Sequence, residues 1–325
     1  MTDSNLDIAK INHLLMPVRG RFKNAMRKFL LIGFGSAIFA SIVVWFLSFL
    51  SPILLLGIWV LIAGAGASLG HQSLERVSRE VREIVEPTMM SAFSLVPAEE
   101  CEDQQFAMAF NQLGLFAYGE YLDTTLAYES SDKRGLQLQE LEVTRLVYDA
   151  ALRRMKYRVV FVGQTLQGFV DQYDGEPFLL IPRSFEIESL RVGERNAFLG
   201  EDFDRKTKTD REMSKHFQVW GRKQFGGEVV SETIRKGIIE AAEMFPRNQI
   251  SIGVTSDESC RLILRMSVDL GALYARESSA NAPIDDAVIQ KFQKKLSKLL
   301  LCYDLIREAV MSGQSQNSNV PTTGT

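Results

Sequence analysis

Residues 29–70 form a run of 42 amino acids without a single Asp, Glu, Lys, Arg or His. As one helix, at about 1.5 Å per residue, this segment would reach about 63 Å, roughly twice the hydrocarbon thickness of a bilayer. Ser51 and Pro52 interrupt the apolar run near its middle. The segment therefore predicts two transmembrane helices, at about residues 29–49 and 53–69, joined by a very short turn.

A single buried core helix or a cleaved signal peptide could also contain a long apolar segment. Helices of globular proteins, however, seldom exceed about 25 residues. A signal peptide has only about 7–15 apolar residues before a small-residue cleavage site. Both alternatives fit residues 29–70 poorly, and the two-helix interpretation is favoured.

Basic residues flank the apolar segment on both sides, whereas the turn between the two spans carries no charge. Because Lys and Arg stay on the cytoplasmic side of a membrane, both ends of this hairpin are expected to be cytoplasmic. The flanking basic residues are Arg19, Arg21, Lys23, Arg27 and Lys28 before the first span, and Arg76, Arg79 and Arg82 after the second.

Residues 1–28 form a basic amphipathic arm. Apolar residues recur every three or four positions from Ile8 to Met26, which indicates a helix, and Pro17 is expected to kink or restart it. An apolar stripe beside basic side chains is typical of a helix that lies on anionic lipid. The stripe fits packing against the protein's own cytosolic domain equally well. A lipid contact would use Arg19, Arg21, Lys23, Arg27 and Lys28.

Small residues cluster within the spans, among them Gly66 and Gly70 in a Gly-x-x-x-Gly spacing. Such residues let helix backbones approach closely, and we expect them to pack the two spans of one hairpin together. Neither span contains an ionisable side chain, so nothing in them predicts a proton relay or an ion pathway.

From residue 71 onward, charged and apolar residues mix in patterns that predict an α+β cytosolic domain, residues 71–312. The fold class is therefore α+β, anchored by an N-terminal two-helix transmembrane hairpin. Residues 73–93 are expected to continue the second span as a stalk that ends at Pro87 or shortly after it. Residues 313–325 are rich in Ser, Gln, Asn and Thr, which predicts a disordered tail. The other expected helices are 99–113, 228–245 and 284–310, and the expected strands are 124–128, 136–147, 158–162, 166–170, 178–181, 216–220, 250–254 and 261–266.

Three short stretches of this domain resemble a known family. They are Leu113-Gly114-Leu115-Phe116 with Tyr118 and the acidic region 140–142; Val160-Phe161-Val162-Gly163 with Leu166, Phe169, Gly175 and Phe178-Leu179-Leu180; and Glu212 with Phe217-Gln218-Val219-Trp220, Phe245 and Ile250. Over roughly residues 72–266 the chain resembles the bacterial membrane proteins that carry domain of unknown function 3137. The resemblance implies a cytosolic α+β domain behind a pair of N-terminal helices in the bacterial cytoplasmic (inner) membrane. It supplies no activity and no catalytic residues.

Histidines and cysteines are few and widely spaced. No pair of histidines has the spacing of a helical zinc site. The cysteines form no Cys-x-x-Cys motif and fit free thiols in a reducing cytoplasm. A catalytic pair would need one of the cysteines to meet His216 in space, and a buried, unreactive cysteine is the commoner case. These residues are His13, His71, His216, Cys101, Cys260 and Cys302.

Phosphate-binding and acidic motifs are equally incomplete. Gly226-Gly227 lacks the rest of a phosphate-binding loop and fits a plain turn. An acidic cluster at residues 201–204 is followed directly by basic residues, which is typical of a solvated loop. The net charge of −3 excludes a global basic surface for nucleic acid. We therefore predict no catalytic, cofactor-binding or metal-binding residues, no cofactor and no nucleic-acid partner.

The expected final helix, residues 284–310, carries a regular apolar seam beside a patch of lysines. The seam spans only about three heptads, so docking on the domain's own sheet is favoured over a coiled coil between two chains. The lysines would add attraction to anionic lipid if they faced a bilayer. The seam consists of Val288, Phe292, Leu296, Leu299, Tyr303, Ile306 and Val310, and the patch of Lys291, Lys294, Lys295 and Lys298.

These patterns favour a membrane-anchored protein whose cytosolic domain is a non-enzymatic interaction module. Its expected partners are the lipid bilayer, through residues 29–70, and an unidentified protein. The alternative is an uncharacterised hydrolase or ligand-binding enzyme whose site is built from dispersed polar residues, because sites are recognised by geometry more than by spacing. A deep pocket with convergent titratable groups would favour the enzyme, and an exposed apolar patch would favour the module.

Overall fold

The computed structural model divides the chain into two compact units. One comprises Met1–Phe93 with Ala275–Lys291, and the other Ser94–Tyr274 with Phe292–Thr325. The residues that the structure describes are 8–47, 51–98, 103–116, 119–131, 135–170, 173, 175, 177–183, 205–206, 212–221, 230–246, 249–256, 261–271, 273 and 286–312. The predicted tail at 313–325 lies outside these ranges.

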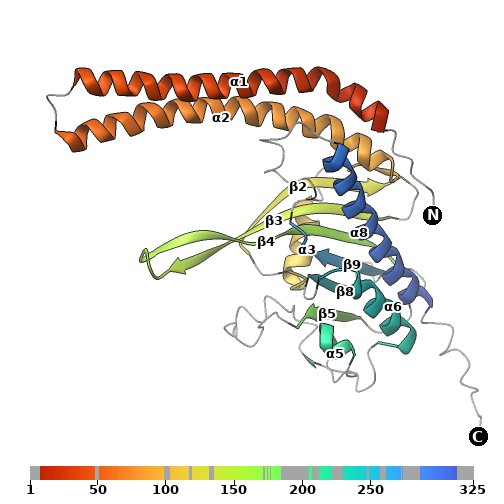
Figure 1. Ribbon diagram of the computed structural model, residues 1–325. Helices are drawn as coiled ribbons and strands as arrows, with labels where there is room; N and C mark the ends of the chain where they lie inside the picture. The colour runs from red at the N-terminus through yellow and green to blue at the C-terminus, as the bar shows by residue number, and fades with distance from the viewer. Residues whose placement is uncertain are drawn as a thin grey trace, which may run out of the picture. The chain divides into compact units, whose positions relative to one another are not determined.

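The first unit contains a hairpin of two long helices, α1 (Ile8–Phe46) and α2 (Pro52–Ser91) (Figure 1). The break at Pro52 is where the sequence predicts it, because proline is well suited to the first turn of a helix. Helix α2 continues past the apolar segment as the predicted stalk and ends four residues after Pro87. Of the kink or restart expected at Pro17, the restart does not occur, because α1 is one helix from Ile8 to Phe46.

The two helices of the hairpin pack through small residues. Ala40 is fully buried, and a Cβ added at Gly66 would overlap the side chain of Ser36. The indole Nε1 of Trp59 donates a hydrogen bond of 3.2 Å to the hydroxyl of Ser41. Gly66 therefore lies where the two helices approach closely, as expected, whereas Gly33, Gly35 and Gly64 face open space.

Both helices contain a segment long and apolar enough to cross a membrane, Lys23–Phe46 in α1 and Pro52–Leu69 in α2. Only 6% of each segment is buried. The core helix of a soluble protein would be mostly buried, so this exposure argues against that alternative.

The second unit is built on an antiparallel sheet with the strand order β1-β2-β3-β4-β9-β8-β5-β7-β6. Strands β8 and β9 form a hairpin that is inserted between β4 and β5, although β8 begins more than sixty residues after β5 ends. The strands are β1 (Leu95–Pro97), β2 (Tyr121–Ser130), β3 (Gln137–Asp149), β4 (Arg154–Phe169), β5 (Phe178–Pro182), β6 (Arg205–Lys206), β7 (Phe217–Gly221), β8 (Ile250–Ser256) and β9 (Leu262–Val268).

Helices cover both faces of this sheet. Helix α3 (Asp103–Gln112) lies on one face, and α6 (Glu232–Glu243) and α8 (Asp286–Ser312) lie on the other (Figure 1). Neighbouring residues of β9 point to opposite faces. Ser267 donates to the carbonyl of Leu115 just after α3, whereas the sulfur of Met266 lies 3.8 Å from the Cys302 sulfur on α8.

The face under α3 holds an aromatic core. The rings of Phe106 and Phe110 stack at 5.0 Å between centroids, those of Phe110 and Phe116 at 6.4 Å, and those of Phe116 and Phe161 at 4.8 Å. Leu179 from β5 belongs to the same cluster. Because this cluster joins α3 to β4 and β5, it locks the two halves of the sheet together.

Helix α8 docks on its own domain, as the apolar seam predicts. The six seam residues whose side chains are described are all buried, and a Cβ added at Gly237 of α6 would overlap Ala309. The Cys302 thiol donates to the Ala241 carbonyl at 3.7 Å. The buried seam residues are Phe292, Leu296, Leu299, Tyr303, Ile306 and Val310.

Two of the expected strands, 158–162 and 166–170, are in fact one continuous strand, β4. A glycine often marks the end of a strand, and the sequence therefore predicts a break at Gly163. In the structure Gly163 lies within β4 and pairs with Leu141 of β3. A Cβ at this position would overlap the carbonyl oxygen of Val268 in β9. The glycine therefore permits a close backbone approach inside the sheet.

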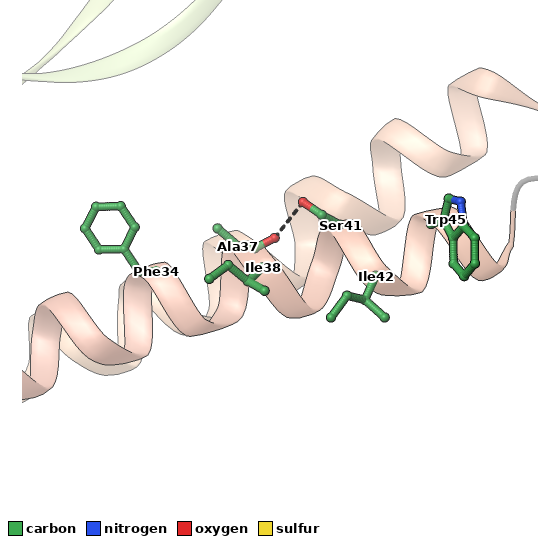
Figure 2. A pocket seen from close by; sticks show the side chains of 6 residues that line it. All are labelled: Phe34, Ala37, Ile38, Ser41, Ile42 and Trp45. Atoms are coloured by element: carbon green, nitrogen blue, oxygen red, sulfur yellow. Dashed lines mark hydrogen bonds between the residues drawn. The ribbon is translucent and has the colours of Figure 1, made fainter.

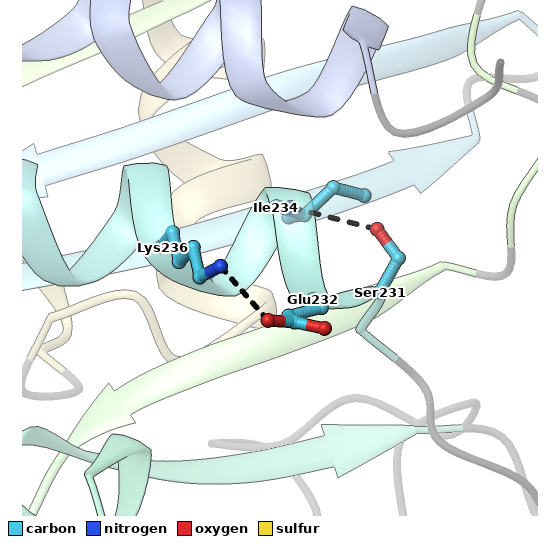
Figure 3. A network of polar contacts seen from close by, with 4 residues as sticks. All are labelled: Ser231, Glu232, Ile234 and Lys236. Atoms are coloured by element: carbon cyan, nitrogen blue, oxygen red, sulfur yellow. Dashed lines mark hydrogen bonds and ion pairs between the residues drawn. The ribbon is translucent and has the colours of Figure 1, made fainter. Parts of the chain in front are cut away.

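Boundaries of two further elements differ from prediction. Helix α6 begins at Glu232 because Ser231 caps it: the Ser231 hydroxyl accepts a 3.5 Å hydrogen bond from the Ile234 amide (Figure 3). Glu232 also forms an ion pair of 2.8 Å with Lys236 one turn later. His216 is the last residue of a short helix, α5 (Met213–His216), and strand β7 begins only after it.

Candidate interaction surface

Strands β3 and β4 continue past their neighbours as a two-stranded ribbon (Figure 1, yellow-green). Pairing with β2 ends at Thr144, and pairing with β9 involves only residues 164–169 of β4. Beyond these points β3 and β4 pair only with each other in the described register, from Arg145 with Arg158 to Asp149 with Arg154. We call residues 144–159 the ribbon.

The turn of the ribbon is stabilised by its own backbone and by Asp149. The Asp149 carboxylate accepts hydrogen bonds from the amides of Ala151 at 3.0 Å and Leu152 at 3.1 Å. Arg153 then adopts a left-handed conformation with φ of 50°. An aspartate that bonds two residues ahead is a common way to fix a tight turn.

One face of the ribbon is apolar and exposed. Residues that pair across β3 and β4 share a face, and alternate residues along each strand do so as well. Exposure reaches 62% for Tyr148, 53% for Met155 and 54% for Tyr157, and 52% for Leu152 in the turn. The members of this apolar face are Leu146, Tyr148, Met155, Tyr157 and Val159, with Tyr121 of β2 beside them.

Tyr121 anchors the base of the apolar face. Its ring meets that of Tyr157 edge to face at 5.2 Å, and the two hydroxyls are 3.1 Å apart. This hydrogen bond raises the pKa of the Tyr157 hydroxyl above its ordinary value. The Glu120 carboxylate accepts a 2.7 Å hydrogen bond from the Leu146 amide and holds β3 at the same point.

The opposite face of the ribbon is basic. Arg145 pairs with Arg158 in the register, and Val147 pairs with Lys156. With the arginine of the turn, residues 144–159 contain five basic side chains and one acidic one, a net charge of +4. The ribbon therefore combines an uncharged aromatic face with a cationic face. The basic residues are Arg145, Arg153, Arg154, Lys156 and Arg158.

Sequence reasoning missed most of this surface, because it assigned no element to residues 148–157. The signal was present in the alternation of Arg154, Lys156 and Arg158 with Met155 and Tyr157. Such alternation is typical of a strand with two unlike faces.

A buried carboxylate lies on the α8 side of the sheet. Glu140 accepts hydrogen bonds from the Thr125 hydroxyl at 2.8 Å and from the Leu273 amide at 2.5 Å. Gln164 donates to the same carboxylate at 3.3 Å and to the Gly271 carbonyl at 2.7 Å. The two side chains thus fasten the segment around Gly271 to the sheet, which is a structural role.

A row of buried polar side chains lies on the α3 side. The Arg265 guanidinium donates to Gln167 at 3.2 Å and to the Thr255 hydroxyl. The Thr165 hydroxyl donates to the carbonyl of Gln139 at 3.3 Å. Side-chain hydrogen bonds thus link β9 with β4 and β8, and β4 with β3.

An open groove of about 410 Å³ runs along α1 and is lined by residues of the apolar segment Lys23–Phe46 (Figure 2). Its polar group is Ser41, whose hydroxyl donates to the Ala37 carbonyl at 2.9 Å. The lining residues are Phe34, Ala37, Ile38, Ser41, Ile42 and Trp45.

The basic residues predicted to contact lipid all lie on α1, and the side chains of Arg21, Lys23, Arg27 and Lys28 are exposed. The lysine patch on α8 is only partly available. Lys298 stacks on the ring of Phe245 at 4.9 Å, and Lys295 donates to the Leu270 carbonyl at 3.5 Å.

The other residues considered for catalysis or metal binding are cysteines, histidines, a glycine pair and an acidic cluster. Cys302 is buried on the side of α8 that faces α6 and β9, and burial raises the pKa of its thiol to about 12, so it is not a thiolate nucleophile. His13 and His71 are exposed on the helical hairpin, and His216 is half-buried. Among described residues, no group of three or more His, Cys, Asp or Glu is placed to hold a metal ion. Cys101, Cys260, Gly226-Gly227 and the acidic cluster 201–204 lie outside the described residues.

Comparison of the chain with family models, with curated proteins and with solved structures finds no significant match.

Proposed function

We propose that this protein is a membrane-anchored interaction module. In this proposal the helical hairpin is a multi-pass anchor in a bacterial inner membrane, with both termini in the cytoplasm. The α+β unit then works in the cytosol by binding rather than by catalysis, and the ribbon is its contact surface. The resemblance to the family with domain of unknown function 3137 fits this layout.

Exposure of the two apolar helical segments supports the anchor. Leu31, Phe34 and Trp45 of α1 are about seven-tenths exposed, as is Leu61 of α2. Water is a poor environment for such side chains, whereas the hydrocarbon core of a bilayer suits them. The basic residues at both ends of the hairpin support a cytoplasmic location for those ends.

The single observation that carries the binding role is the exposed apolar face of the ribbon. A two-stranded hairpin is at best marginally stable in water unless something covers one of its faces. Within the described residues, the apolar face beyond Tyr121 and Tyr157 is solvent-exposed. A partner that covers Tyr148 and Met155 would remove this surface from water.

Photo-crosslinking in living cells tests the proposal. A benzoyl-phenylalanine in place of Tyr148 should form adducts, because a partner covers this position. The control places the same group at Lys236, which is 75% exposed on α6 and forms its ion pair on the domain's own surface. Mass spectrometry of the labelled peptides identifies the adducts. Adducts at neither position, or equally at both, would contradict the proposal.

A further inference from the structure

The ribbon's occupant must offer both an apolar and an anionic environment. Tyr148, Met155 and Tyr157 are each more than half exposed on one face, and Lys156 and Arg158 lie on the other. In the turn of the ribbon an apolar and a basic residue are adjacent, because Leu152, which is 52% exposed, precedes Arg153. A purely polar ligand would leave the apolar face in water, and a neutral apolar one would not use the net charge of +4.

A second copy of the chain fits this surface poorly. Two ribbons stacked through their apolar faces or joined along their edges would bring two net charges of +4 together, and like charges oppose such pairing. A nucleic-acid duplex can admit a two-stranded ribbon in its major groove, but it would leave much of the tyrosine and methionine surface exposed.

The interface of an anionic bilayer meets both requirements. Tyrosine concentrates at membrane–water interfaces, where the ring is apolar and the hydroxyl stays hydrated. Arginine and lysine have long stems that let a charged head reach lipid phosphates while the stem lies on apolar surface. Lys156 and Arg158 alternate with Tyr157 along β4 and point to the opposite face, but β9 pairs only with residues 164–169 of β4. Their long stems can therefore bend around the open edge of β4 toward phosphates at the level of the tyrosine hydroxyls.

We propose that the ribbon is a membrane-binding element that lays its apolar face on the bilayer interface and binds anionic phospholipid through its basic side chains. This inference rests on the proposed anchoring of the chain, because a tethered domain meets the bilayer at a high effective concentration. The ribbon then holds the cytosolic unit against the membrane at a second point.

Hydrogen exchange of the full-length chain in nanodiscs tests the inference without any protein partner. The two nanodiscs contain phosphatidylcholine alone, or an equimolar mixture of phosphatidylcholine and phosphatidylglycerol. Amides of residues 145–158 should exchange at least about fivefold more slowly in the anionic nanodiscs, the effect of one basic side chain at an anionic surface. The slowing should disappear at about 1 M salt, where the Debye length is about 3 Å.

Two variants with the same loss of charge separate the ribbon from the rest of the surface. Lys156→Gln with Arg158→Gln should abolish the slowing, whereas Lys215→Gln with Lys236→Gln, on α5 and α6, should retain it. Unchanged exchange in β8 and β9 verifies that each variant is folded. Tyr148→Ser with Met155→Ser, which keeps all the charges, should weaken the slowing, because the apolar contact is lost.

Several results would overturn the inference. They are equal exchange in both nanodiscs, slowing that survives the Lys156 and Arg158 substitutions, protection in detergent that rises with protein concentration, and protection that requires added DNA. The third outcome would indicate a second copy and the fourth a nucleic acid. If Tyr148 forms protein adducts in cells while the nanodisc result is negative, the proposed interaction role stands and only the lipid assignment fails.

Discussion

Glu140 shows how a single buried carboxylate can hold a distant segment of the chain. Its oxygens accept from Thr125 on β2 and from Leu273, 133 residues later in the sequence. Glu142 lies two residues further along the same strand and on the same face, but it is only half-buried. The contrast between these two glutamates makes the role of Glu140 measurable.

Replacing Glu140 with Gln should lower the free energy of unfolding by about 1–3 kcal/mol, because the new amide group would face a donor and leave it unsatisfied. Glu142→Gln should change it by less than about 0.5 kcal/mol. Urea unfolding of the full-length chain in detergent measures both values. Equal stability of the two variants would show that the Glu140 contacts are not needed.

Cys302 is predicted to be inert in the folded protein. Burial raises the pKa of its thiol from 9.0 to about 12, so the thiol stays protonated when the chain is folded and ionises more easily when it unfolds. Its contribution to stability is therefore complete below about pH 9 and is lost as the pH rises toward 12. At pH 8, iodoacetamide should label Cys302 only as fast as the protein unfolds, as peptide mass mapping can show. Rapid labelling of the native protein, at the rate seen in denaturant, would refute this.

Two variants of helix α8 can distinguish docking of this helix on its own domain from association between two chains. Phe292 is 2% exposed in the seam, whereas Leu301 is 42% exposed on the opposite side of the helix. Phe292→Asp should destabilise the domain by more than about 3 kcal/mol, because it removes a buried ring and places a charge there. Leu301→Asp should cost less than about 1 kcal/mol.

Thermal unfolding and light scattering together measure this pair of variants. A Phe292→Asp protein that stays folded and merely changes from dimer to monomer would favour the coiled coil that the seam also permits.

Elements in which apolar side chains recur at a regular spacing could be predicted from the sequence. Features that depend on packing against neighbouring strands could not. The seam of α8 and the β8–β9 hairpin follow from side-chain spacing alone. Gly163 misled the strand prediction, because a glycine that ends a strand and one that admits a neighbouring backbone look the same in sequence. The exposure of the ribbon could not be predicted from the sequence either. It depends on the start of β2 at Tyr121 and on which part of β4 pairs with β9.

For the whole molecule, the testable property is the topology of the hairpin. A reporter that is active only outside the cytoplasm should be active when fused at Ser51 and inactive when fused at Ser312, because basic residues flank the two apolar segments and not the turn. Measuring reporter activity in cells of both fusions checks this. Activity at Ser312 would place the α+β unit on the other side of the membrane and remove the basis of the proposed function.

The two long apolar helices were the part of the molecule most legible in the sequence, since 42 uncharged residues constrain a chain more than any motif. The exposed ribbon was the least legible. Its residues are ordinary for a strand, and only the arrangement of β2, β3, β4 and β9 leaves them uncovered. No pattern within residues 144–159 specifies how far the neighbouring strands extend.

The order of strands in the sheet also has a consequence for biosynthesis. The two central strands, β8 and β9, leave the ribosome after β1 to β7, so one edge of β4 and one edge of β5 have no hydrogen-bonding partner until residue 268 has been made. By then the apolar segments in residues 23–69 have long left the ribosome. Folding of the sheet must therefore wait for its last hairpin, and its high contact order makes that closure slow. During this interval the nascent chain carries two unprotected strand edges, which is when it is most exposed to aggregation and most dependent on chaperones.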